Sequence, residues 1–71
     1  MSDLQILRMN ILGGMNEYVR ELGDEDLWEI WIEVFPDECD EDELAEIAGD
    51  DSIWLTCVER FAYVCKQAGI I

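Results

Sequence analysis

The sequence predicts an all-α fold, a compact bundle of three to four short helices. Apolar residues recur every three or four positions through almost the whole chain, and no segment alternates apolar and polar residues as a strand does. With 71 residues there is room for one domain, spanning 1–71. An apolar share of 51%, with three Trp, separates the chain from disordered acidic tails, which are poor in such residues.

The first segment has an amphipathic stripe that is interrupted by two glycines. Its apolar positions are Leu4, Leu7, Ile11, Met15, Tyr18 and Leu22. Gly13 and Gly14 cost about 1–2 kcal/mol together in a helix interior. We therefore expect a break there, with the firmer helix over residues 15–22. Residues 1–14 would then form a separate short helix or an extended arm.

The second helix is expected between two breakers. Gly23 is a stop signal, Asp24 a candidate N-cap, and Pro36 ends the helix near Phe35. Between residues 27 and 35 only Glu29 and Glu33 are polar. A helix that is apolar nearly all round lies either at the centre of the domain or against a partner.

Two further helices follow an acidic linker. Asp40 and Glu43 have the spacing of a capping box, which predicts a short helix over residues 41–48. Its expected inward residues are Leu44, Ile47 and Ala48. Asp51 or Ser52 would cap the last helix, and Gly69 would end it. The inward stripe of that helix comprises Ile53, Trp54, Cys57, Val58, Phe61, Val64, Cys65 and Ala68.

The charge balance excludes several classes of function. There are 18 Asp and Glu against 4 Lys and Arg, no His, and a net charge of -14. Without His there is no Ser-His, Cys-His or His-metal site. So few cations exclude direct binding to nucleic acid, and the negative charge opposes binding to an anionic membrane. No apolar run could span a bilayer and no basic leader begins the chain, so we expect a cytoplasmic protein.

Candidate catalytic and cofactor chemistry is equally sparse. Cys39, Cys57 and Cys65 lack paired zinc spacing and are expected to be reduced thiols, two of them in the core. The acidic linker does not match a calcium-binding loop, and we expect no metal, no cofactor and no enzyme activity. The stretch around Ser52 is similar to the Asp-Ser-Leu sequence on which acyl carrier proteins hold phosphopantetheine. That family has about half a domain after the Ser, however, and a helix cap is the favoured interpretation.

The distribution of acidic residues carries the functional signal. Between residues 21 and 51 there are 15 acidic residues in 31 and no Lys or Arg. Nine lie at expected helix starts, where carboxylates cap amides and complement the helix dipole: Asp24, Glu25, Asp26, Asp40, Glu41, Asp42, Glu43, Asp50 and Asp51. The shortage of cations predicts a surface that docks on a strongly basic protein surface. The candidate partner-binding residues are Glu29, Glu33, Asp37, Glu38, Asp40, Glu41, Asp42, Glu43 and Glu46.

A second hypothesis uses the apolar residues instead. Trp28 and Trp31 share one side of their helix and belong either to the core or to an apolar interface. In the second case the protein is a small helical adaptor or oligomerisation module. A homodimer would also help to stabilise so small a core.

In size, charge and fold class the whole chain resembles the small acidic proteins that phages and prophages use against host nucleases, such as anti-CRISPR proteins and DNA mimics. The resemblance rests on no shared motif. It implies a phage-encoded inhibitor in the bacterial cytoplasm that occupies the nucleic-acid-binding surface of a nuclease or CRISPR effector. Our leading hypothesis is therefore a non-enzymatic DNA mimic that acts through protein–protein interaction.

Overall fold

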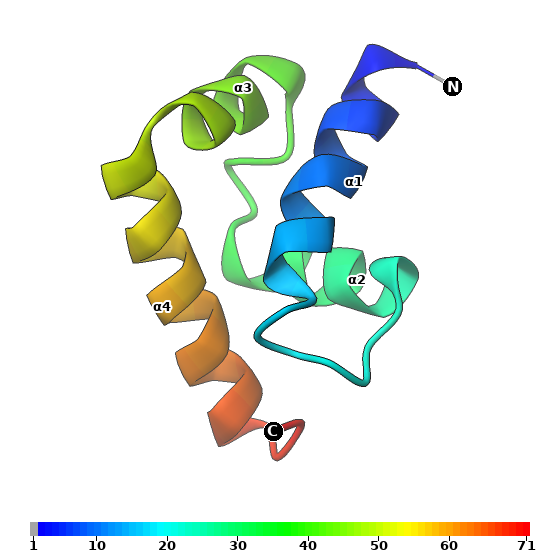
Figure 1. Ribbon diagram of the computed structural model, residues 1–71, viewed down its shortest axis with the longest axis vertical. Coiled ribbons are helices and arrows are strands. Elements are labelled where there is room, and N and C mark those ends of the chain that lie inside the picture. The colour runs from blue at the N-terminus through cyan, green and yellow to red at the C-terminus, as the bar shows by residue number, and fades with distance from the viewer. Residues whose placement is uncertain (1) are drawn as a thin grey trace.

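The computed structural model describes residues 2–71 and contains four helices, as the helical spacing of the apolar residues predicts (Figure 1). They are α1 (Asp3–Met15), α2 (Asp24–Val34), α3 (Glu41–Gly49) and α4 (Asp51–Gln67). No strand occurs among these residues, so the predicted all-α class is confirmed. In the same range no helix is long and apolar enough to cross a bilayer.

The first helix differs from the prediction in both position and course. Helix α1 begins at a complete capping box, in which Ser2 and Gln5 each accept the other's backbone N–H at 3.2 Å. It continues through Gly13 and Gly14 to Met15, so the expected break at the glycines is wrong. Of the two alternatives for residues 1–14, a separate short helix is found over residues 3–14 and an extended arm is not. The helix contributes to the core, and residue 1 lies outside the described part.

The expected helix over residues 15–22 is replaced by turns. The backbone N–H groups of Tyr18 and Val19 both bond to the carbonyl of Met15, and the chain reverses before Gly23. Val19 is fully buried, whereas Tyr18, which the pattern placed in the apolar stripe, is 54% exposed. The reversal brings α2 back against α1, and it inserts Val19 rather than Tyr18 into the core.

Side-chain caps start α3 and α4, whereas α2 starts at a glycine without one. Gly23 is the N-cap of α2, and Asp24 is its first residue rather than the cap. Asp40 accepts the backbone N–H of Glu43 at 3.0 Å, which confirms the predicted cap of α3. The cap of α4 is Asp50, not Asp51 or Ser52: its Oδ1 accepts two backbone N–H groups, at 2.9 and 3.2 Å.

The end of α4 also follows from one residue. Gly69 has a φ of 77°, a left-handed conformation that glycine adopts without steric cost. Its N–H bonds to the carbonyl of Lys66, and the N–H of Ile70 reaches back to the carbonyl of Cys65 at 2.9 Å. This is a Schellman motif. It turns Ile70 back against the core, while Ala68, which was expected to face inward, is exposed.

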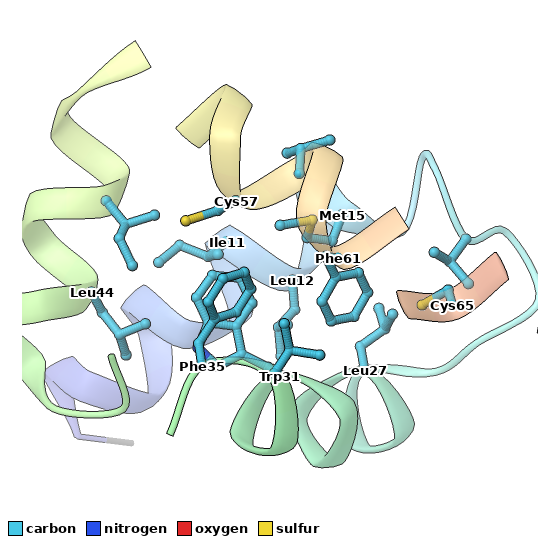
Figure 2. Close-up of a cluster of buried hydrophobic side chains, with 14 residues drawn as sticks. Ile11, Leu12, Met15, Leu27, Trp31, Phe35, Leu44, Cys57, Phe61 and Cys65 are labelled. Carbon is cyan, nitrogen blue, oxygen red and sulfur yellow. The ribbon is translucent and has the colours of Figure 1, made fainter. Parts of the chain in front are cut away.

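The four helices enclose one apolar core. Helix α1 packs against α2 and α3, and α4 packs against the same two helices. In the view of Figure 1, α3 lies at the top, α2 lies below α1, and α4 runs down the left side to the C-terminus at the bottom. Trp31 and Phe61 are the largest fully buried side chains and lie with Leu12, Leu27 and Cys65 in the centre (Figure 2). The core sits on the inner sides of all four helices, so the acidic residues are left on the outside.

Candidate protein-binding surface

Every carboxylate of the described residues is at least partly exposed, because no polar or charged residue in the range 2–71 is buried. All nine acids expected at helix starts are found there, as N-caps or in the first turns of α2, α3 and α4. Their positions are thus explained by capping and by the helix dipole.

The connection between α2 and α3 is held firmly against the core. The indole N–H of Trp31 donates to the carbonyl of Glu38 at 3.2 Å, and the Cys39 thiol donates to the carbonyl of Phe35 at 3.2 Å. The rings of Trp31 and Phe35 are in contact, with centroids 4.6 Å apart. These contacts fix the acidic linker in one place relative to α2.

This fixed linker and α3 bring six carboxylates together. The pKa of Glu43 is raised by partial desolvation and then by the charges of four neighbouring carboxylates. The pKa of Cys39 is raised by burial and then by three carboxylates, two of which are shared with Glu43. We call the resulting group the acidic cluster: Asp37, Glu38, Asp40, Asp42, Glu43 and Glu46. Every charged group that acts on Glu43 is a carboxylate, so the immediate surroundings of Glu43 are negative.

Three of the nine sequence-predicted residues are not among the charges that act on Glu43 or Cys39. Glu41 is exposed in the first turn of α3 but is not among the charges acting on Glu43 or Cys39. Glu29 and Glu33 are exposed on α2, one turn apart, and likewise act on neither group. The structure therefore joins the linker acids to those of α3, and places Glu29 and Glu33 on a separate helix.

Two arginines were missed by sequence reasoning. The guanidinium of Arg8 lies over the ring of Trp28 at 4.8 Å, and that of Arg60 lies over Phe35 at 5.2 Å. Both rings belong to the stretch without cations, so folding brings cations to it from α1 and α4. Glu38 and Arg60 share a shallow pocket with Cys57 and shift its pKa in opposite directions, after the dominant rise caused by burial. The acidic cluster is therefore bounded by Arg60 on the α4 side.

Trp28 and Trp31 differ in how deeply they are buried. Trp31 is fully buried, and its indole is engaged with the linker. Trp28 is half-buried beneath Arg8. Trp31 therefore belongs to the core and offers no exposed surface to a partner.

The two buried thiols of α4 have raised pKa values. Burial raises the pKa of Cys57 and of Cys65, which disfavours the nucleophilic thiolate. Among residues 2–71 no group of three or more His, Cys, Asp or Glu side chains is arranged to hold a metal ion. The backbone N–H of Ser52 bonds to the Asp50 cap, which places Ser52 in the first turn of α4.

No protein-family model, curated protein or solved structure matches this chain. A function has to be inferred from the surface described above, in which the acidic cluster is the feature with the most pronounced physical character.

Proposed function

We propose that the protein is a non-enzymatic acidic inhibitor, which binds a basic, nucleic-acid-binding surface of a partner protein and excludes nucleic acid from it. The acidic cluster is the observation that supports this proposal. It holds six carboxylates within residues 37–46, and the charges acting on its member Glu43 are all negative. Such a surface attracts lysine- and arginine-lined grooves over long range and competes there with the phosphates of DNA or RNA.

Rigidity supports the same proposal. A flexible acidic tail would lose conformational entropy on binding, whereas the linker is already held by the Trp31 and Cys39 hydrogen bonds. The pKa of Glu43 is raised first by desolvation and then by four neighbouring carboxylates, so part of the rise comes from repulsion between carboxylates in the free protein. A basic partner would relieve this repulsion, which adds to the free energy of binding.

The partner class that fits is a bacterial nuclease or CRISPR effector, as the resemblance to phage inhibitors implies. The alternative, a helical adaptor acting through Trp28 and Trp31, keeps only Trp28 as a contact residue, because Trp31 contributes no exposed surface.

Charge reversal at matched positions tests whether the acidic cluster is the binding surface. The double variant Asp42→Lys with Glu46→Lys changes two exposed residues of α3, neither of which is a helix cap. It takes the net charge from -14 to -10. Glu17→Lys with Glu59→Lys changes the net charge equally at exposed sites outside the cluster. We expect only the first pair to abolish binding. Equal loss in both pairs would mean that global charge, rather than this surface, is responsible.

The partner itself can be sought by affinity capture. The immobilised protein is incubated with bacterial lysate at low salt, and bound proteins are eluted either with salt or with excess duplex DNA before mass spectrometry. We expect nucleic-acid enzymes in both eluates and none after loading at high salt, because the attraction is screened. Capture that persists in high salt, or that contains no nucleic-acid enzyme, would contradict mimicry.

A further inference from the structure

Helix α4 forms the least negative part of this acidic chain. Residues 52–71, which include all of α4 except its first residue, contain Glu59 against Arg60 and Lys66 and carry +1. Residues 2–20 are neutral, and residues 21–51 carry -15. Because two copies of the chain each carry -14, they repel each other least where their α4 helices face one another.

The side of α4 that points away from the core also exposes two large apolar side chains. Leu55 is 56% exposed and Tyr63 is 64% exposed, whereas the core takes the opposite side of the helix, with Cys57 and Phe61. Leu55 and Tyr63 lie eight residues apart, about 12 Å along the helix axis, with Glu59 midway between them. Residues four apart lie on the same side of a helix, so these three form one ridge. The outer side of α4 therefore combines apolar contact area with charge.

The charges of α4 follow an order along the helix that is complementary to its own reverse. Asp51 begins the helix, and Lys66 lies in its last turn. Glu59 and Arg60 are adjacent at its middle. In an antiparallel pair of such helices, opposite charges meet at both ends and at the centre, whereas in a parallel pair like charges meet at every level. The two helix dipoles are also opposed in the antiparallel arrangement, which is favourable.

We propose that the outer side of α4 binds the same side of a second copy of the chain, with the two helices antiparallel. A two-fold axis between residues 59 and 60 places Glu59 of each copy opposite Arg60 of the other. Measured along the axis, Lys66 then lies within about 3 Å of Asp51 of the other copy, and Leu55 within about 1.5 Å of Tyr63 of the other copy. Each of these contacts occurs twice, as a two-fold interface requires.

The order of the charges identifies a second copy as the occupant. A basic partner would be drawn to the acidic cluster and repelled by Arg60 and Lys66. An acidic partner would meet Asp51 and Glu59, and it would be repelled by the net charge of -14. A surface that carries acids and bases in the reverse order matches α4 at every level, and the chain itself supplies that surface. The apolar area is small, so the dimer is weak.

Exchanging the charges at the two ends of α4 tests the proposal. Sedimentation equilibrium of the full chain, from micromolar to millimolar concentration at one ionic strength, should show the mass rising from 8.2 kDa toward twice that value. Lys66→Glu replaces two attractive contacts by two repulsive ones and should raise the dimer dissociation constant about tenfold or more. Adding Asp51→Lys restores opposite charges across the interface, so the double variant should regain most of the lost affinity.

A matched control separates this contact from the effect of net charge. Lys66→Glu with Glu17→Lys has the same net charge of -14 as Lys66→Glu with Asp51→Lys, but Glu17 is exposed beyond the end of α1. This control should remain as weak a dimer as Lys66→Glu alone. Among the apolar residues, Tyr63→Gln should weaken the dimer, whereas Ile6→Gln, at an exposed residue of α1, should leave it unaltered.

All of these substitutions are at exposed residues, and thermal unfolding followed by circular dichroism verifies that each variant is folded. A mass that stays monomeric at every concentration would overturn the proposal. So would a rescue of Lys66→Glu by Glu17→Lys that equals the rescue by Asp51→Lys, or a dimer that Ile6→Gln weakens as much as Tyr63→Gln. None of the variants changes a residue of the acidic cluster, so partner capture tests the proposed function separately.

Discussion

Replacing each of the adjacent glycines of α1 by alanine should have opposite effects on stability. Both residues lie inside the helix, where alanine is favoured over glycine by about 1 kcal/mol. At Gly13 the new methyl group enters open space, so Gly13→Ala should realise this gain in full. For a domain of this size, that corresponds to a rise in Tm of about 4–8 °C.

At Gly14 the same gain is opposed by a steric contact. The added Cβ would lie 3.0 Å from Cζ2 and 3.4 Å from Cη2 of Trp54, so the indole has to shift by several tenths of an ångström. Overpacking of this kind costs about 1–3 kcal/mol. Gly14→Ala should therefore be neutral or destabilising by up to about 2 kcal/mol, and should be less stable than Gly13→Ala by about 1–3 kcal/mol.

Urea unfolding followed by circular dichroism at 222 nm measures the free energy of unfolding of both variants. This signal comes from all four helices together and does not rely on Trp54 fluorescence. Low protein concentration keeps self-association out of the comparison. A double-mutant cycle with Trp54→Leu provides the control, because the smaller side chain should remove most of the cost of Gly14→Ala. Equal stabilisation at both positions would show that Trp54 does not pack on Gly14. Destabilisation by Gly13→Ala would show that α1 is not continuous through the glycines.

Three further predictions follow from single contacts. Trp31→Phe removes the donor to the Glu38 carbonyl and should destabilise the protein by about 1–3 kcal/mol, with faster hydrogen exchange in the linker. Asp50→Ala should cost about 1 kcal/mol because two backbone N–H groups lose their cap, whereas Asp51→Ala should have a much smaller effect in the same denaturation assay. The raised pKa of Glu43 means that the folded state binds this proton more tightly than the unfolded state. Stability at low salt should therefore rise as the pH falls through that pKa toward the ordinary value for glutamate. Thermal melts that show no such rise would contradict the raised pKa, and a rise that salt does not reduce would leave desolvation, without mutual repulsion in the acidic cluster, as its cause.

The starts of α2, α3 and α4 could be predicted to within one or two residues because they depend on local chemistry. A carboxylate that caps a helix contacts amides only two or three residues away, as Asp40 and Asp50 do. The inward stripe of α4 was predicted for the same reason, since helical periodicity is a local property; Cys57, Phe61 and Cys65 are all buried.

The course of the first helix could not be predicted, because local preference and tertiary packing disagree there. Two glycines oppose the helix by about 1–2 kcal/mol, whereas burying Ile11, Leu12 and Met15 contributes about 1.5–3 kcal/mol for each side chain. Burial is the larger effect, and the contact of Trp54 with Gly14 depends on a residue 40 positions away. Nothing near the glycines in the sequence indicates this contact.

The candidate surface was also predictable in part. The density of acids in residues 37–46 is a property of the sequence, and so is the absence of cations between residues 21 and 51. The tertiary structure decided which of these acids form the acidic cluster, because Trp31 holds the linker in place. Glu29 and Glu33 lie outside the cluster.

The sequence by itself determined the helical class, the helix starts and the amount of negative charge, because each depends on composition or on neighbours within one or two turns. Only the tertiary structure decided that Trp31 is core, and that Arg8 and Arg60 cover the rings of Trp28 and Phe35. The sequence of a helix that is apolar nearly all round does not indicate which of its sides is buried. A cation–ring contact joins residues that are far apart in the sequence. Both depend on how the helices pack, and packing brings cations to a stretch of sequence that has none.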